Sequence, residues 1–292
     1  MPIQKTPLVS VIMNCLNGEQ YLREAIDSVY AQTYDNWEII FWDNASYDGT
    51  KKIAKSYDSK LKYFKSEVTS ILGAARVLAV EKAKGEYFAF LDCDDIWYKE
   101  KLDKQMNIFL DDKENVGLVY GGSEVLYENK NKNEKVMNRG YLLEGEIFPN
   151  LIRENCIVFS SAIVKREVFY ASGGFPINIK HSTDYWLFLN IASKYRIRAV
   201  QEICCTYRYH SENLSSKNRI LAAKEAIKIV SMHLPGKAAE EGLKYHYDNL
   251  AIAYAKEWLL IESLTHLFKH GGLLRILLKV INKITRMLRV KS

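Results

Sequence analysis

Three carboxylates lie close together in segment 90–95 (FLDCDD), directly after an apolar run. Carboxylates at this spacing repel one another unless a cation or hydrogen-bond donors compensate their charge. Mg²⁺ and Mn²⁺ commonly take one or two protein carboxylates and fill their other positions with water and substrate phosphate. The pattern therefore predicts a divalent metal that stabilises a diphosphate leaving group. In the simpler alternative, Asp95 caps a helix beginning near Tyr98, and Asp92 and Asp94 are merely solvated.

Strand and helix patterns alternate through the segments that lead to this cluster. Such alternation implies parallel strands joined by right-handed crossovers, and therefore an α/β fold. Ligands of open sheets of this kind bind beyond the carboxyl ends of the strands, which here lead into Asn14, Asp43, Asn44 and the acidic cluster. The expected strands are Leu8–Met13, Trp37–Trp42, Leu61–Phe64 and Tyr87–Leu91, and the expected helices are Tyr21–Gln32, Gly49–Tyr57 and Leu72–Lys84.

The later part of the chain changes character twice. Segment 128–139 (ENKNKNEKVMNR) is polar and without periodicity, which predicts a solvated loop. Beyond residue 216 the pattern is helical, with a break at Pro235 and Gly236. We therefore expect an α/β domain over 1–215 and a helical region over 216–292, with helices at Leu221–His233, Lys237–Lys269 and Leu273–Arg289.

Composition and charge exclude several classes of protein. The 292 residues are 48% hydrophobic, which suits a globular core, and the five cysteines lack the paired spacing of a disulfide framework or zinc site. We find neither a signal-peptide pattern nor an apolar run of membrane-spanning length, so a cytoplasmic location is expected. Segment 263–292 carries seven of the Lys and Arg residues and no acid, although the net charge of the whole chain is only +6. A basic tail on a nearly neutral body argues against a nucleic-acid binder and for a local anionic partner.

Several further motifs occur in a characteristic order. They are VSVIMNCLNG at 9–18, QTY at 32–34, EIIFWDNASYDGT at 38–50, and GAAR at 73–76 running through KGEY at 84–87 into the acidic cluster. This series resembles family 2 glycosyltransferases, closely over residues 8–112 and more loosely to about 215. The resemblance implies a GT-A fold, a Rossmann-like and mostly parallel sheet flanked by helices that binds a nucleotide sugar.

The resemblance also implies roles for individual residues. It places Asn14, Asp43 and Asn44 near the base, Arg76 near the nucleotide, Asp92 toward the ribose and Asp94 on a Mn²⁺ or Mg²⁺ ion. One departure is Asn44, where the family usually has a second acid; its amide oxygen can still accept a hydrogen bond, and uridine remains the expected base.

Two later segments extend the resemblance. GGFP at 173–176 is followed by STDYWL at 182–187, where the family commonly has Glu-Asp before a helix, so Asp184 is the candidate general base and Thr183 replaces the usual Glu. Inversion in one displacement needs a carboxylate that takes the proton of the acceptor hydroxyl. As a residue type, Asp184 also suits a helix cap. Arg208 and His210, in YRYHSENLS at 207–215, match a segment whose cationic or imidazole groups can face the diphosphate or metal, although a His after a strand also suits a surface or core position.

The substrate classes follow from the same resemblance. The Gln-X-X-Arg-Trp signature of processive synthases is missing from the sequence, which favours the transfer of a single sugar. The expected donor is a nucleoside diphosphate sugar, and the expected acceptor is a glycan or a polyprenyl-linked sugar of a microbial cell surface.

The basic end has the pattern of an interfacial helix. Apolar residues form one helical stripe and cations surround it, so reversible contact with an anionic membrane is expected through 273–289, on the inner face of the cell membrane. The stripe could equally pack on the preceding helices or on a second copy of the chain. The stripe consists of Leu273, Leu277, Val280, Ile281, Ile284 and Leu288, and the cations are Arg275, Lys279, Lys283, Arg286 and Arg289.

Two other functions compete with the transferase. A dinucleotide-dependent oxidoreductase shares the alternating elements, but NCLNG at 14–18 lacks the GxGxxG turn that binds pyrophosphate. A degenerate transferase that only binds a nucleotide sugar, or assembles partners at a membrane, is suggested by Asn44 and Thr183. The presence of Asp92, Asp94 and Asp184 argues against it.

Overall fold

The computed structural model describes residues 6–112, 114–129, 132–137, 140–214 and 218–256. Within it the chain divides into two compact units. The first comprises the residues up to 151 together with 155–213, and the second comprises 152–154 together with the residues from 214 onward. The sequence analysis put this division at 215–216 and did not anticipate that 152–154 would join the second unit.

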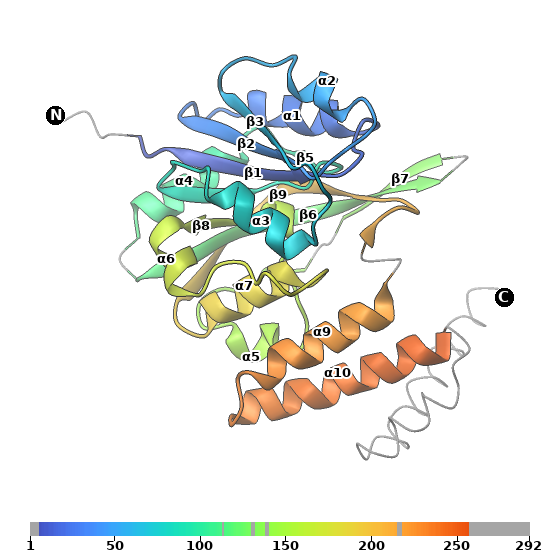
Figure 1. Cartoon of the computed structure of the whole chain (residues 1–292). Coiled ribbons are helices and arrows are strands. Elements are labelled where there is room, and N and C mark those ends of the chain that lie inside the picture. The colour runs from blue at the N-terminus through green and yellow to red at the C-terminus, as the bar shows by residue number, and fades with distance from the viewer. Residues whose placement is uncertain (1–5, 113, 130–131, 138–139, 215–217, 257–292) are drawn as a thin grey trace. The chain divides into compact units, whose positions relative to one another are not determined.

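The amino-terminal half of the first unit is a parallel sheet covered on both faces. Strand β1 (Val9–Cys15) pairs in parallel with β2 (Trp37–Asp43) and with β4 (Tyr87–Phe90), and β2 pairs with β3 (Leu61–Lys65). Helices α1 (Leu22–Tyr30) and α2 (Thr50–Ala54) lie on one side, and α3 (Leu72–Val80) lies on the other (Figure 1). The α/β prediction is confirmed, with β1 and β2 extending one or two residues beyond the expected ends.

Alternation along β1 divides its side chains between these two faces. Val9, Val11, Met13 and Cys15 belong to a core that includes the buried stripe of α1. The intervening residues, including Asn14, therefore face the side on which α3 lies, because successive side chains of a strand point to opposite faces.

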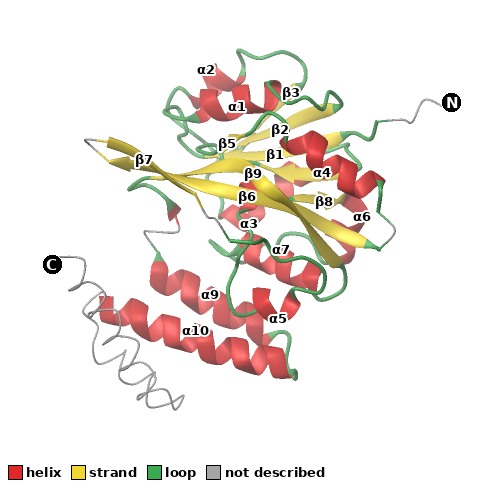
Figure 2. Ribbon diagram, turned by 180° about the vertical axis from the view of Figure 1, so that it is seen from behind, coloured by secondary structure: helices red, strands yellow, loops and turns green. Residues whose placement is uncertain are grey.

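Strands of both directions complete the sheet, whose order is β3-β2-β1-β4-β8-β6-β9-β5. Strand β8 (Ile163–Lys165) is antiparallel to both β4 and β6 (Val116–Asn129), while β9 (Arg196–Tyr209) runs parallel to β6 and pairs with the short β5 (Ile96–Trp97). Figure 2 shows the long strands β6 and β9 side by side. The remaining elements of the unit are α4 (Lys101–Leu110), α5 (Phe148–Leu151), the 3-10 turn η1 (Phe159–Ser161), α6 (Arg166–Ala171) and α7 (Thr183–Ala192).

The loop predicted over 128–139 is wrong. Strand β7 (Lys132–Met137) pairs antiparallel with the end of β6, with Glu124 opposite Met137 and Asn129 opposite Lys132. Backbone pairing with a neighbouring strand supplies the hydrogen bonds here, and a search for apolar periodicity does not detect a strand of this kind. The hairpin therefore brings Glu128 of β6 into a fixed position.

In the second unit the described residues form helices α9 (Arg219–Ser231) and α10 (Lys237–Lys256), which lie side by side (Figure 1). Within this unit His246 of α10 contacts the backbone carbonyl of Ile152, with 3.1 Å between Nε2 and the oxygen. The predicted helix Leu273–Arg289 and the end of the predicted helix Lys237–Lys269 lie outside the described residues. In the portion of the chain that is described, no helix has the length and apolar character needed to cross a membrane.

Candidate functional site

The carboxyl ends of β1 and β2 present two different sets of side chains. Asn14 is directly paired with Trp42, and Cys15 is directly paired with Asp43. Because directly paired residues of neighbouring strands point to the same face, Asn14 and Trp42 share the α3 side, and Asp43 shares the α1 side with Cys15. The predicted base-binding residues Asn14 and Asp43 are thus separated by the sheet.

Asp43 builds the turn that follows β2. It is fully buried, with one carboxylate oxygen 2.7 Å from the backbone nitrogen of Ser46 and the other 2.6 Å from the hydroxyl of Tyr63. Between Asp43 and Ser46, Ala45 has a φ of 69°, a left-handed conformation that is costly for a residue with a side chain. The hydrogen bonds of Asp43 hold this turn in place, which is a structural use of the carboxylate.

Asn44 connects the same turn to the segment before α3. Its amide nitrogen donates to the carbonyl oxygen of Ser70 over 2.8 Å, and its side-chain oxygen accepts the backbone N–H of Ser70 over 3.1 Å. The Ser70 hydroxyl also donates to that oxygen over 3.0 Å. An amide offers both a donor and an acceptor for this clasp, whereas the acid usual at this position offers acceptors alone when ionised.

Arg76 of α3 connects the acidic cluster to the segment that carries Asp184. Its guanidinium donates to Asp92 over 3.1 Å and to the hydroxyl of Thr183 over 2.5 Å. The guanidinium also stacks on the ring of Phe159, 3.6 Å from the ring centroid. With 5% of its side chain exposed, Arg76 is held rigidly, and Thr183 gains a role that accounts for its presence beside Asp184.

The position of α3 depends on a glycine. A Cβ atom on Gly73 would lie 2.0 Å from the carbonyl oxygen of Pro176, and the backbone N–H of Gly73 donates to Ile179 over 3.3 Å. This close approach joins the first turn of α3 to the loop that precedes Asp184. It thereby brings the Arg76 guanidinium within hydrogen-bond distance of Thr183.

The carboxylates of the acidic cluster have different environments. Burial raises the pKa of Asp92 to about 6, against the attraction of Arg76, and neighbouring Asp94 and Asp184 add to the rise. Burial also raises the pKa of Asp95 well above its usual range. Asp95 accepts hydrogen bonds from the Ser160 hydroxyl over 2.5 Å and from the backbone N–H of Arg208 over 2.9 Å, so it anchors the turn.

Asp94 and His210 converge as potential metal ligands. His210 Nε2 lies 3.0 Å from Asp94 Oδ2, and Asn213 Nδ2 lies 3.5 Å from the same oxygen. Both side chains are partly exposed, at 24% for Asp94 and 14% for His210. Among the described residues no group of three or more His, Cys, Asp or Glu side chains forms a protein cage for a metal. An arrangement with few protein ligands suits Mg²⁺ or Mn²⁺, which complete their coordination with water and phosphate.

Arg208 was predicted to face the diphosphate of the donor. In the structure its side chain is engaged by protein groups. Its guanidinium pairs with Glu24 of α1 and with Glu128 of the β6–β7 hairpin, and it stacks on Tyr21 with 4.5 Å to the ring centroid. It also donates through Nε to the backbone carbonyl of Asp94 over 2.9 Å. Arg208 therefore positions the acidic turn by holding the backbone carbonyl of Asp94.

Asp184 lies in the first turn of α7. The amide of Asn155 donates to its carboxylate over 3.0 Å. Burial raises the pKa of Asp184, and the nearby positive charge of Arg76 opposes that rise. A carboxylate whose pKa is raised in this way is a stronger proton acceptor than an ordinary surface Asp.

Several residues that build this site carry no signal in the sequence. Ser160 bridges the acidic cluster by donating to Asp95 and accepting the backbone N–H of Asp92 over 3.1 Å, and Phe159 supports Arg76. Asn155 is another such residue. These residues lie in irregular segments far from their partners in sequence, where no periodic signal exists; the family resemblance was only loose there.

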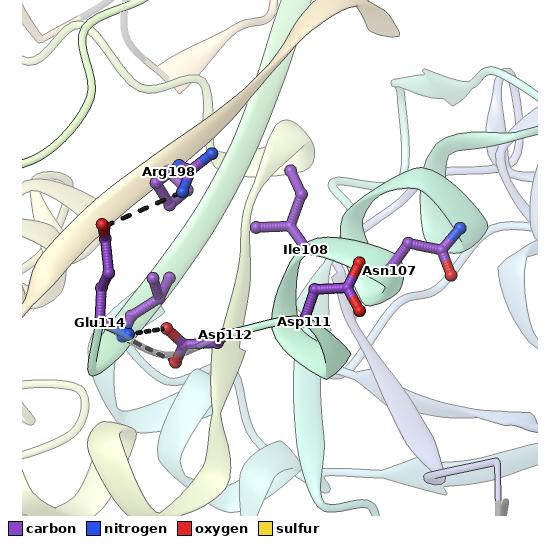
Figure 3. A pocket seen from close by; sticks show the side chains of 7 residues that line it. Asn107, Ile108, Asp111, Asp112, Glu114 and Arg198 are labelled. Atoms are coloured by element: carbon purple, nitrogen blue, oxygen red, sulfur yellow. Dashed lines mark hydrogen bonds and ion pairs between the residues drawn. The ribbon is translucent and has the colours of Figure 1, made fainter.

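The first unit also has a pocket in which charged lining side chains pair with other groups of the protein. Figure 3 shows its lining side chains, among them Asp112, Glu114 and Arg198. Asp112 accepts the backbone N–H groups of Glu114 and Val116 and pairs with Lys165 over 2.9 Å. Arg198 pairs with Glu114 over 3.9 Å. The pocket contains none of the predicted site residues.

Comparison with known proteins adds sequence relationships. Residues 10–172 match the model of a family described as Glycosyl transferase family 2. One relative is the UDP-Glc:alpha-D-GlcNAc-diphosphoundecaprenol beta-1,3-glucosyltransferase WfgD of Escherichia coli, 32% identical over 212 residues that cover 72% of this chain and 80% of WfgD. An uncharacterized glycosyltransferase of Rickettsia felis is 34% identical, and the match covers 72% of this chain but 36% of that longer protein.

Solved structures share the fold at low sequence identity. S. aureus TarS 1–349 in complex with UDP-GlcNAc superposes with a TM-score of 0.62 and 18% identity, covering 89% of this chain and 72% of TarS. The mannosyltransferase PcManGT of Pyrobaculum calidifontis, in complex with GDP-Man and Mn²⁺, has a TM-score of 0.63 and 20% identity, covering 98% and 81% of the two chains.

Proposed function

Since this chain belongs to glycosyl transferase family 2 and is a glycosyltransferase, we propose that it transfers a single sugar, with inversion, from a nucleoside diphosphate sugar to the hydroxyl of a glycan or lipid-linked acceptor. The observation that carries this proposal is the bridge made by Arg76 between Asp92 and Thr183. It joins the acidic turn, which faces the donor, to the helix that carries Asp184, the proposed base.

The proposed reaction is one displacement at the anomeric carbon. The acceptor oxygen forms a bond to that carbon, its proton passes to Asp184, and the bond from the carbon to the diphosphate oxygen breaks with its electron pair on the leaving group. The raised pKa of Asp184 favours acceptance of the proton. Arg76 keeps a positive charge beside the carboxylates throughout the reaction.

Asp94 and His210 are the residues that would hold Mn²⁺ or Mg²⁺. When bound there, the ion would stabilise the negative charge of the departing diphosphate. The 3.0 Å approach of His210 to Asp94 supports this assignment, and Arg208 fixes the backbone carbonyl of Asp94 from β9.

The proposed donor is a uridine diphosphate sugar. WfgD is named for UDP-Glc and TarS was solved with UDP-GlcNAc, whereas PcManGT was solved with GDP-Man. We assign Asn14 to the base, as an amide on the α3 face of the sheet. Asp43 and Asn44 support the base indirectly, because they hold the turn after β2.

The proposed acceptor is lipid-linked, as the name of WfgD states for that relative. For such an acceptor, we propose that the protein works at the cytoplasmic face of the membrane. Residues 273–289, which lie outside the described part of the chain, would provide the contact through apolar residues and cations.

A panel of nucleotide sugars, with and without Mn²⁺, tests the proposal by measuring binding and nucleoside diphosphate release. We expect the wild-type protein to turn over one UDP-sugar only when Mn²⁺ is present. Asp94→Ala should lose this metal-dependent turnover, and Asp111→Ala should bind and turn over the donor as the wild-type protein does. Asp111 is an exposed carboxylate at the far end of α4 and serves as a matched control. If the wild-type protein bound no donor, the transferase proposal would be overturned in favour of a scaffold.

A further inference from the structure

Two buried donors at the carboxyl edge of the sheet have no hydrogen-bond partner among the residues that the structure describes. They are the amide nitrogen Nδ2 of Asn14 and the indole nitrogen Nε1 of Trp42. Trp42 is 7% exposed. A buried polar group without a partner costs free energy and is uncommon in folded proteins, so this pair requires an explanation.

The two donors belong to one location. Asn14 and Trp42 are directly paired in the register of β1 and β2, so both side chains stand on the α3 face. The same register pairs Ile12 with Phe90, and Asp92, two residues further on, therefore shares this face with Asn14. On α3 itself, the Nε atom of Arg76 is also buried and unpartnered.

The two acceptors that directly follow Trp42 in the chain are already engaged. The amide oxygen of Asn44 is taken by Ser70, and the carboxylate of Asp43 is directed to the opposite face, where it accepts from Ser46 and Tyr63. Within the described part of the chain neither Asn14 Nδ2 nor Trp42 Nε1 meets an acceptor, so a substrate oxygen is the acceptor to consider.

Charge and position indicate which part of a donor substrate would supply that acceptor. Phosphate oxygens are typically bound by Arg, Lys or a metal, whereas neutral amide and indole N–H groups suit a neutral carbonyl oxygen. Trp42 is two strands from β4, about 10 Å across the sheet, and the acidic turn that would hold the diphosphate follows β4. Trp42 therefore lies toward the nucleoside end, and Asn14 on β1 lies between Trp42 and the acidic turn.

We infer that Trp42 is a substrate-binding residue, whose indole N–H acts with the Asn14 amide to bind a carbonyl oxygen of the nucleotide base. This inference rests on the proposed function and adds a residue to its donor site. Trp42 thereby contributes to base recognition through a hydrogen bond as well as through packing.

The test compares Trp42→Phe, which keeps an aromatic ring and removes the N–H, with Trp37→Phe. Trp37 is a matched control because it is a buried Trp on the same strand, 5% exposed, but it packs on Tyr30 on the opposite face. The measurement is calorimetric binding of UDP and of inorganic pyrophosphate, both with Mn²⁺. Pyrophosphate reports the metal and phosphate contacts without a base.

We expect Trp42→Phe to weaken UDP binding about five- to twentyfold, the effect of losing one hydrogen bond, and to leave pyrophosphate binding unchanged. Trp37→Phe should change neither affinity. Equal affinity of Trp42→Phe and wild type for UDP, or equal losses for UDP and pyrophosphate, would overturn the inference while leaving the proposed function in place. Failure of the wild-type protein to bind UDP would instead remove the proposed function.

A measurement on the wild-type protein guards against misfolding of the variant. The indole ¹H–¹⁵N resonance of Trp42, identified by its disappearance in Trp42→Phe or in a milder Trp42→Tyr, should move when UDP is added and stay in place with pyrophosphate. An indole resonance that stayed in place with UDP would contradict a contact between Trp42 and the base. Where the resonance moves, the loss of UDP affinity in Trp42→Phe reports the hydrogen bond itself.

Discussion

The carboxylate of Asp184 is subject to two opposing influences, burial, which favours its neutral form, and Arg76, which favours its charged form. If Asp184 is the base, Asp184→Asn should lower kcat by about 10²- to 10⁴-fold, because the amide cannot accept the proton. Donor affinity should change little, since the substitution keeps the shape of the side chain. Steady-state kinetics together with donor binding would separate the two effects, and Asp111→Asn is the matched control.

The raised pKa of Asp184 also predicts the pH dependence of turnover. A general base acts in its deprotonated form, so activity should fall as pH decreases through the raised pKa, at a pH above the ordinary Asp value of about 3.9. Removing the opposing charge with Arg76→Gln should move this acidic limb to still higher pH. The profile of kcat at saturating donor is the measurement, and an unmoved limb would assign the ionisation to another group.

Ser160 serves two members of the acidic cluster and offers a test of how the turn is held. In Ser160→Ala the almost fully buried Asp95 loses a hydroxyl donor, and the backbone N–H of Asp92 loses its acceptor. We expect a loss of about 1–3 kcal/mol in the free energy of unfolding, measured by urea denaturation. Ser193→Ala, which removes an exposed hydroxyl at the end of α7, should stay within about 0.5 kcal/mol of wild type.

At the level of elements, α3 must approach the loop at 176–179 closely for Arg76 to reach its partners. Gly73→Ala tests this requirement, because the new methyl group would lie 2.0 Å from the Pro176 carbonyl oxygen. An ordinary Gly-to-Ala change inside a helix stabilises by about 1 kcal/mol. Here we expect the opposite sign, a destabilisation of about 1–3 kcal/mol with weaker UDP binding. Thermal unfolding and calorimetry check both, and a stabilised variant would contradict the described packing.

The elements differ in how well the sequence predicts them. The strands β1 to β4 follow from short, mainly apolar runs and helix α1 follows from apolar periodicity, because each contributes side chains to the same core. Strand β7 was missed, because pairing with β6 rather than periodicity determines it. The positions of Asn14, Asp92 and Asp94 at strand ends could be predicted from the alternation. The hydrogen bonds of Asp43 to Ser46 and Tyr63, and the bond from Arg208 to the Asp94 carbonyl, could not be predicted in this way. Contacts between segments distant in sequence determine most of them.

At the scale of the whole molecule, the chain combines a nearly neutral body with a basic end. If residues 273–289 bind a membrane, the full chain should float with vesicles that contain anionic lipid and remain unbound with neutral vesicles. Reversing three charges with Lys279→Glu, Lys283→Glu and Arg286→Glu should abolish flotation and leave soluble-acceptor activity intact. Retained flotation of this variant would argue that the segment instead packs on protein.

The contacts of Arg208 with the acidic turn also bear on the stage of folding at which the site becomes complete. The backbone N–H of Arg208 binds Asp95 and its side chain binds the carbonyl of Asp94, at sequence separations of 113 and 114. Contacts this distant in sequence form late, because a long loop must close before they give any stabilisation. A nascent chain on the ribosome can therefore assemble β1 to β4 while its acidic turn still lacks an anchor. A complete metal-binding turn should therefore arise only when β9 has been synthesised and has joined the sheet.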